Sequence, residues 1–295
     1  MVEKNHTFQI LANGFMCILA ALCILPFMLL FSSSLTGEHE LIRQGYRFIP
    51  GSIDFSAYHY ILIDTNSILR GYIISSAVTV AGTLCNLTIT TLFAYPLSIK
   101  ELPGRRALSF FLFFTMLFNG GLIPTYIMWT QFFRIKNTFA ALLVPNLLMG
   151  AFYVIMMRTY FTNSIPQDTI DAARIDGASE PRILVSVVIP MSKPILSTLA
   201  LLVGLNYWND WVNGMYYIND DRYYSIQLLL NRMLMDTQFM MQNTNNKYGN
   251  IDTSQLPSTG IKMAIAVMGV LPVLIVYPFL QKYLVKGITI GAVKG

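Results

Sequence analysis

Residues 71–98 read GYIISSAVTVAGTLCNLTITTLFAYPLS and contain no Asp, Glu, Lys or Arg. A helix crosses the hydrocarbon core of a bilayer with about 20 predominantly apolar residues, so this stretch is long enough to span it. Similar apolar segments lie on either side of it, at roughly 9–33, 107–130, 139–160, 184–207 and 261–285. The sequence therefore predicts an all-α, polytopic membrane protein with six transmembrane helices in one domain, residues 1–295.

The composition supports a membrane location. Of the 295 residues, 54% are hydrophobic and only 12% are charged, whereas a soluble chain carries roughly 25% charged residues. The net charge of +5 comes from Lys and Arg residues in small groups beside the apolar segments. Because these residues form neither a basic face nor an RNA-stacking motif, we expect a lipid bilayer as the surroundings and no nucleic acid as a partner.

The first apolar segment could be mistaken for a secretory signal peptide, because Lys4 precedes it. Its apolar run is longer than the 7–15 residues of a signal core, and no convincing cleavage site follows Pro26. We therefore interpret residues 9–33 as an uncleaved transmembrane helix.

The distribution of Lys and Arg predicts the orientation, because short cytoplasmic loops are enriched in these residues. Three regions that fall on one side of six alternating spans carry them: Lys100, Arg105 and Arg106; Arg158, Arg174, Arg182 and Lys193; Lys282, Lys286 and Lys294. Arg134 and Lys136 do not fit this charge rule, since the topology places them outside. Both termini and the loop 161–183 are thus predicted to be cytoplasmic, with segments 34–70 and 208–260 outside.

The second outer segment divides into two parts. Apolar residues recur at helical spacing between Tyr224 and Met241, which predicts a helix that lies along the membrane interface or packs on the bundle. A run rich in Asn, Gln, Thr and Ser follows from Thr237 to Thr259 and predicts a surface loop.

The sequence lacks the residue patterns that metal binding, redox chemistry, ATP binding and ion coupling require. Cys17, Cys23 and Cys85 lie in apolar stretches and the three histidines are scattered, so we expect no metal site, redox centre or catalytic constellation. No GxxxxGK[ST] loop is present to cradle ATP. The spans hold few carboxylates, which an ion-coupled carrier usually needs. Polar residues such as Asn86, Asn119 and Asn146 serve either interhelical hydrogen bonding or a polar path.

The predicted cytoplasmic loop contains SIPQDTIDAARIDGASEPR at residues 164–182. Ser164 is suited to cap a first short helix, which Pro166 begins and Gly177 ends, since Gly adopts a left-handed conformation without steric cost. Ser179, Glu180 and Pro181 begin a second helix, which continues through Ile189 and Pro190 into the fifth span. The loop is thus predicted to be a rigid elbow.

The first helix of this elbow is shaped for a partner. Ala172 and Ala173 let another surface approach closely, and Asp171, Arg174 and Asp176 offer charged contacts around them. From spacing alone, an ordinary connecting helix explains the segment equally well.

The sequence DAARIDGA at 171–178, followed by Ile189 and Pro190, resembles the EAA motif of ATP-binding cassette (ABC) importer permeases, with Asp171 in place of Glu. The resemblance implies the type I ABC importer permease fold and a coupling helix held in a cleft of an ATPase subunit. It assigns the ATPase contact to Asp171, Ala172, Ala173, Arg174, Asp176, Gly177 and Ala178. ATP and Mg would then bind in the partner ATPase subunits, and this chain would bind no cofactor and would not be an enzyme.

Two further stretches resemble the carbohydrate branch of that family, the relatives of the smaller maltose permease subunit: YWNDWVNG at 207–214 and the tail 277–295. The forms PFLQKY at 278–283 and NGGLIP at 119–124 are similar to the subgroup that imports larger or uronic oligosaccharides, such as alginate fragments. The resemblance implies two ATPase subunits, a second, non-identical permease and an extracellular sugar-binding protein, in a bacterial cytoplasmic membrane. It also implies that the Gly-containing tail 287–295 reaches the ATPase subunits with an extended or closely packed backbone.

Alternatives remain at this stage. The chain could serve another solute, such as amino acids, peptides or phosphate, or act as an ion-coupled carrier. Trp208 and Trp211, with Tyr216 and Tyr217, form either an aromatic belt at the membrane boundary or a ring that contacts sugar. The candidate substrate path consists of Asn119, Asn146, Trp208, Asn209 and Trp211.

Overall fold

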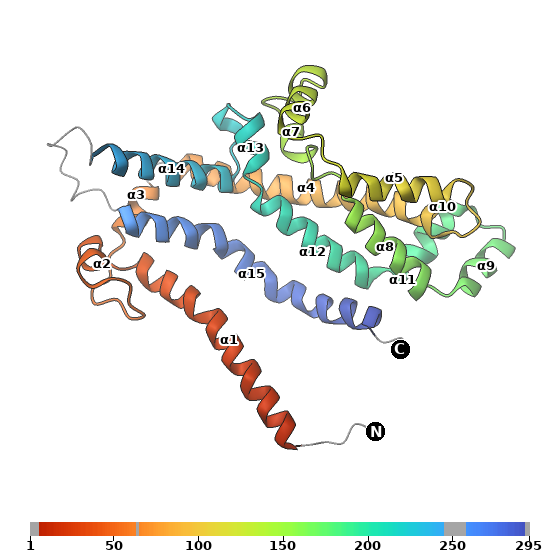
Figure 1. Cartoon of the computed structure of the whole chain (residues 1–295), viewed down its shortest axis with the longest axis horizontal. Coiled ribbons are helices and arrows are strands. Elements are labelled where there is room, and N and C mark those ends of the chain that lie inside the picture. Colours follow the sequence, from red (N-terminus) through yellow and green to blue (C-terminus); the bar gives the residue numbers. More distant parts are fainter. Residues whose placement is uncertain (1–5, 63–64, 245–257, 293–295) are drawn as a thin grey trace. The chain divides into compact units, whose positions relative to one another are not determined.

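The computed structural model describes residues 6–62, 65–244 and 258–292. Within these ranges every regular element is a helix, and a single isolated β-bridge pairs Thr36 with Ile53 (Figure 1). The all-α class is therefore confirmed. The helices are α1 (His6–Ser34), α2 (Glu38–Gln44), α3 (Ser56–Leu62), α4 (Thr65–Ser98), α5 (Arg105–Leu117), α6 (Leu122–Ile127), α7 (Ala140–Leu143), α8 (Ala151–Ser164), α9 (Gln167–Ile175), α10 (Glu180–Ile183), α11 (Ile189–Met191), α12 (Lys193–Asn209), α13 (Val212–Tyr217), α14 (Ile226–Thr244) and α15 (Ser258–Ala292), with π-helical turns at Met128–Phe132 (η1) and Leu184–Val188 (η2) and a 3-10 turn at Asp221–Tyr223 (η3).

Contacts divide the chain into two compact units, which we describe separately. Unit 1 comprises residues 1–68 and 230–272, and unit 2 comprises residues 69–229 and 273–295. In unit 1 the Glu38 carboxylate accepts hydrogen bonds from the main-chain N–H groups of Thr259 and Gly260, at 2.9–3.1 Å. This carboxylate thereby satisfies free N–H groups in the first turn of α15, where negative charge is favourable.

Unit 2 has an apolar core between its helices. Leu97 of α4, Val154 and Met157 of α8, Ile183 of α10 and Leu199 of α12 are buried together. Figure 1 shows α9 and α10 at one end of α4 and α12, away from α6, α7 and α13. The core therefore anchors the segment that the sequence singled out as an elbow.

The prediction of six continuous spans is not confirmed. Among the described residues, three helices are long and apolar enough to cross a membrane: Phe8–Ser34, Asn66–Ser98 and Thr259–Val276. Two bent pairs raise the number to five if each pair is one span: Arg105–Leu117 with Leu122–Phe132, bent by 111°, and Glu180–Met191 with Lys193–Asn209, bent by 81°. The first bend follows from Gly121, whose φ of +84° interrupts the helix. The second lies at Ser192, before Pro194, which has no N–H to continue the helical ladder.

The predicted helix at 139–160 is also interrupted, because α7 ends at Leu143 and α8 begins only at Ala151. Pro145 and Asn146, whose φ is +62°, lie in the gap. Main-chain carbonyls in the gap are satisfied by side chains from other helices: Leu143 O by the Tyr207 hydroxyl at 2.9 Å, Pro145 O by the Asn213 amide at 2.9 Å and Leu147 O by the Asn86 amide at 2.7 Å. Non-helical backbone in apolar surroundings needs such partners, so the break is a built feature of the fold.

Two further boundaries differ from the prediction. The helix predicted between Tyr224 and Met241 is present as α14, but it extends to Thr244, so residues 237–244 of the expected surface loop are helical; residues 245–257 lie outside the described ranges. Helix α15 continues to Ala292, so residues 287–292 are helical and not extended; residues 293–295 are not described. Isolated glycines cost a helix only about 1 kcal/mol each, which a long helix tolerates.

Candidate functional site

The elbow consists of α9, a tight turn and α10. Pro166 immediately precedes α9 with extended backbone, so it lies one residue before the first turn in which the sequence placed it. Ser164 does not cap this helix, contrary to the prediction, because it is the last residue of α8. The residue before a proline is biased away from helical conformation, so α8 ends before Ile165, and α9 begins at Gln167, directly after Pro166.

Gly177 ends α9 as predicted. Its φ is +81°, its N–H donates to Arg174 O at 3.0 Å, and the N–H of Ala178 donates to Ala173 O at 3.0 Å. This pair of bonds is the Schellman arrangement, in which a left-handed residue turns the chain sharply out of a helix. Ser179 then precedes α10, which begins at Glu180 with Pro181 in its first turn, also as predicted.

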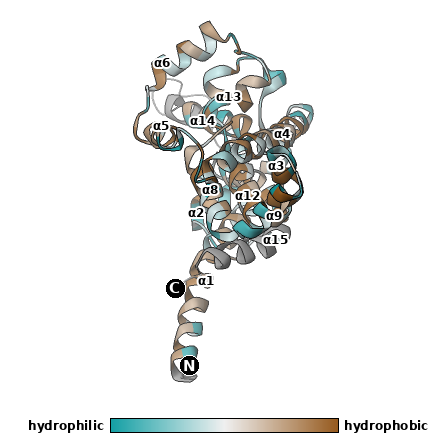
Figure 2. Cartoon of the chain, turned by 90° about the vertical axis from the view of Figure 1, so that its right-hand side faces the viewer, coloured by the Kyte–Doolittle hydropathy of each residue, from teal (hydrophilic) through white to brown (hydrophobic). Residues whose placement is uncertain are grey.

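The two faces of α9 differ in burial. Ile170, Ala173 and Ala178 pack against the apolar core of unit 2. Asp171, Ala172 and Asp176 are exposed, and so is Ile175, whose side chain is 87% exposed. Figure 2 shows hydrophilic residues around α9. Ile175 is thus an exposed apolar side chain among polar neighbours on the outer face of α9.

A chain of polar contacts runs through the elbow. Gln167 donates to Asp171 at 3.1 Å, and Arg174 contacts Asp171 at 3.3 Å. Arg174 also donates to Glu180 at 2.8 Å, and this hydrogen bond raises the pKa of the Arg174 guanidinium. The second oxygen of Glu180 accepts from the Tyr95 hydroxyl at 2.5 Å. The contacts thus begin on α9, cross the turn at Gly177 and end on α4.

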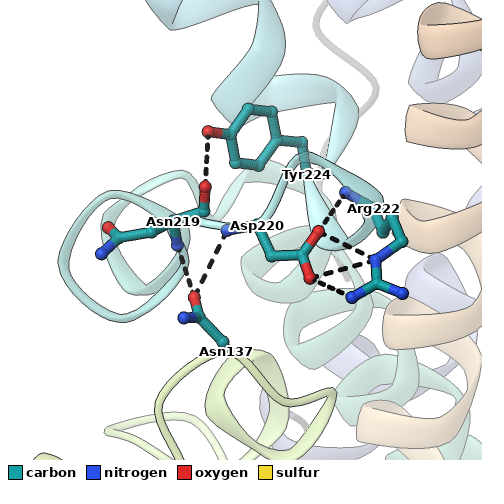
Figure 3. A network of polar contacts seen from close by, with 5 residues as sticks. All are labelled: Asn137, Asn219, Asp220, Arg222 and Tyr224. Carbon is teal, nitrogen blue, oxygen red and sulfur yellow. Dashed lines mark hydrogen bonds and ion pairs between the residues drawn. The ribbon is translucent and has the colours of Figure 1, made fainter.

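A second polar network joins two turns of unit 2 that are far apart in the sequence (Figure 3). The Asn137 side chain accepts hydrogen bonds from the N–H groups of Asn219 at 2.6 Å and Asp220 at 3.3 Å. Asp220 accepts from the Arg222 guanidinium at 2.6–3.0 Å, and these hydrogen bonds lower the pKa of Asp220 to about 2. Tyr224 closes the turn by donating to Asn219 O at 3.3 Å. Sequence analysis did not anticipate this network.

The five residues of the candidate substrate path have different surroundings. Asn119 is exposed and accepts a local hydrogen bond from Gly121 N–H at 2.8 Å. Asn146 and Asn209 are exposed, and Trp211 is half-buried. Trp208 is only 9% exposed and stacks on Tyr72 with ring centroids 6.3 Å apart, so much of its ring is engaged in packing. Asn86, in contrast, donates a hydrogen bond from α4 to Leu147 O in the gap between α7 and α8.

Within the described ranges, no three or more His, Cys, Asp or Glu side chains form a group that could bind a metal ion. The three cysteines are free and exposed.

Two features of the elbow were not predicted from the sequence: the Tyr95–Glu180 hydrogen bond and the exposure of Ile175.

Comparison with known proteins identifies the family to which this chain belongs. Residues 87–290 match the family described as "Binding-protein-dependent transport system inner membrane component". The chain belongs to this family. It is 36% identical, over 99% of its length and 100% of the relative, to the polygalacturonan/rhamnogalacturonan transport system permease protein YtcP of Bacillus subtilis. It is 26% identical to the arabinooligosaccharides transport system permease protein AraQ of Halalkalibacterium halodurans, over 97% of this chain and 96% of that one.

A solved structure of another transporter has a similar fold. A chain of a bacterial ABC transporter involved in the import of the acidic polysaccharide alginate superposes with a TM-score of 0.78 at 31% identity, over 96% of this chain and 98% of that chain. The type I permease fold and the resemblance to carbohydrate importers are thereby confirmed. The protein is a multi-pass inner-membrane component of a transport system, and it is a transport subunit.

Proposed function

We propose that this permease imports oligosaccharides that an extracellular binding protein delivers, using energy from ATP hydrolysed in partner subunits. The observation that carries the substrate class is the full-length similarity to the polygalacturonan/rhamnogalacturonan permease at 36% identity. The alginate importer, at 31% identity, handles another acidic polysaccharide. Fragments of polysaccharides, including uronic ones, are therefore the first substrates to test.

The elbow is the proposed contact with the ATPase. Its inner face is fixed to the core by Ile170, Ala173 and Ala178, whereas the outer face presents Asp171, Ala172 and Asp176 around the exposed Ile175. A helix held rigidly from behind passes a displacement on to the helices that support it. The shorter arm of Asp171, compared with the family's Glu, bonds to Gln167 and Arg174 on its own helix.

The complete transporter, in this proposal, contains two ATPase subunits that bind ATP and Mg, this chain and a second, non-identical permease. Both termini and the elbow face the cytoplasm, and segments 34–70 and 208–260 meet the binding protein outside. Closure of the ATPase subunits moves the two coupling helices, which opens the cavity outward, and hydrolysis reverses the change.

Uptake into proteoliposomes that hold the whole transporter tests this function. The panel contains oligogalacturonides, alginate oligomers, a neutral maltooligosaccharide, a peptide and an amino acid, each with the cognate binding protein. We expect ATP-dependent uptake of at least one oligosaccharide and none of the peptide or amino acid. Uptake without ATP, or uptake of the peptide or amino acid alone, would overturn the proposal.

A further inference from the structure

The Glu180 carboxylate joins three helices at one point. Glu180 is the first residue of α10, and one of its oxygens accepts from Arg174 of α9 at 2.8 Å. Its other oxygen accepts from the hydroxyl of Tyr95, near the end of α4, at 2.5 Å. A planar carboxylate with both oxygens engaged fixes the direction of its partners better than an apolar contact does, because charge-assisted hydrogen bonds depend on geometry.

This link crosses the turn of the elbow. The turn between α9 and α10 rests on Gly177, and among the described residues no atom other than its own and those of its two chain neighbours lies within 4 Å of the place where a Cβ would be. Packing therefore does not brace the turn at that residue. Arg174 lies before the turn and Glu180 after it, so their ion pair closes the turn from the side.

The contact with Tyr95 carries the link into a long helix. The Tyr95 side chain is only 5% exposed and lies in the same apolar core as Leu97 and Ile183. A buried tyrosine needs a partner for its hydroxyl, and Glu180 supplies it from a residue 85 positions later in the chain. A phenylalanine would fill the same space, so packing alone does not explain the hydroxyl.

A purely stabilising role explains the link poorly. The side chain of Glu180 is 48% exposed and that of Arg174 is 33% exposed, and ion pairs open to water contribute little to stability. What the arrangement does provide is a directional connection between α9, which has an unpartnered outer face, and α4.

We infer that Glu180 and Tyr95 are positioning residues that make the end of α4 follow α9 when the ATPase subunits move it. This inference rests on the proposed function, because it requires α9 to be the ATPase contact. Apolar packing holds α9 in place, and the Glu180 link sets the direction in which its displacement reaches α4.

The experiment compares Tyr95→Phe, Glu180→Gln and the double variant in the complete, reconstituted transporter. Tyr160→Phe is the matched control, because its hydroxyl makes only a long bond of 3.4 Å to Met191 O and its ring also packs on the core. For each protein we measure the amount of bound ATPase subunit, the basal ATPase rate and the number of oligosaccharides imported per ATP hydrolysed.

We expect Tyr95→Phe and Glu180→Gln to bind the ATPase normally and to import about tenfold less substrate per ATP, the factor that one charge-assisted hydrogen bond allows. The double variant should be no worse than the more affected single variant, because both substitutions remove one connection. A wild-type import ratio in Tyr95→Phe, or fully additive defects, would overturn the inference. If one single variant assembles poorly, the other single variant is tested with spin labels at Thr169 and Lys100. The distance between the labels should change on nucleotide binding in that variant and stay constant in the wild type.

An Ile175→Asp variant separates this inference from the proposed function. Retention of normal ATPase binding by Ile175→Asp would contradict α9 as the docking site. Loss of ATPase binding in Ile175→Asp together with a normal Tyr95→Phe would leave the docking proposal intact and remove only the Glu180 link.

Discussion

The side-chain amide of Asn86 donates a 2.7 Å hydrogen bond to the main-chain carbonyl of Leu147, which lies in the gap between α7 and α8. Asn86 is almost completely buried on α4 and also accepts a hydrogen bond from Thr90 at 3.2 Å. An apolar replacement removes the side-chain donor of the half-buried Leu147 carbonyl. Asn86→Leu should therefore lower the free energy of unfolding by about 1–3 kcal/mol.

Unfolding of the purified permease in detergent measures this effect. Thr88→Val on the same helix is the control, since its exposed hydroxyl bonds only to Leu84 O of its own helix, and it should change stability by less than about 0.5 kcal/mol. Equal losses in the two variants would show that the bond to Leu147 has no special role.

Close packing of α4 against α12 gives a second prediction. A Cβ on Gly82 would overlap the ring of Tyr207, whose hydroxyl donates to Leu143 O, whereas a Cβ on Gly204 would meet Thr83 at an ordinary 3.5 Å. Gly82→Ala should destabilise the protein by about 1–3 kcal/mol through overpacking. Gly204→Ala should be neutral or slightly stabilising, because Ala favours a helix over Gly. Thermal unfolding of both variants checks the contrast, and a tolerated Gly82→Ala would contradict the packing described here.

Acid should loosen the network of Figure 3. The Arg222 guanidinium lowers the pKa of Asp220 to about 2 in the folded protein, from an ordinary value of 3.8. A lowered pKa means that the ionised form stabilises the fold at pH values above the ordinary pKa, and that this contribution is lost as the pH falls from about 4 to about 2. The protection of the amides at 219–224, measured as the exchange rate relative to the intrinsic rate at each pH, should fall over that range. In Asp220→Asn this protection should be low throughout, and the same dependence of protection on pH as in the wild type would refute the assignment.

The left-handed backbone conformation of Gly177 is expected to be required for coupled transport. Its φ of +81° strains an ordinary residue, while the open space around it admits a side chain. Gly177→Val should weaken the turn by about 2 kcal/mol and lower coupled transport. Gly177→Asn should retain most activity, since Asn enters the left-handed region more readily. Transport and ATPase association measured together test this pair, and equal activity of the two variants would remove the turn from the mechanism.

The sequence predicted the parts of the fold that rest on local patterns. Apolar runs located α1, α4 and α15, and the residues between Pro166 and Gly177 defined α9 almost to the residue. Gly121, Pro145 and Pro194 mark the helix breaks in the sequence. Hydropathy alone, however, predicts one continuous helix across each of them.

Other features depend on residues that only the folded chain brings together. Tyr95 meets Glu180 across 85 positions, and Asn137 meets Asn219 across 82. No local propensity marks such a pair, because each partner is an ordinary residue in its own helix or turn. The exposure of Ile175 is equally invisible in the sequence, since an apolar residue on an amphipathic helix is usually buried.

The most direct test of the coupling account is photo-crosslinking from position 175. A photoreactive amino acid replaces Ile175 in the assembled transporter, and the control carries it at Val185, which is also exposed but lies in η2 beyond the elbow. After irradiation, mass spectrometry identifies the attached protein. If α9 docks on the ATPase subunit, we expect an adduct with that subunit from position 175 and none from position 185. An assembled, active transporter that yields no ATPase adduct from position 175 would contradict it.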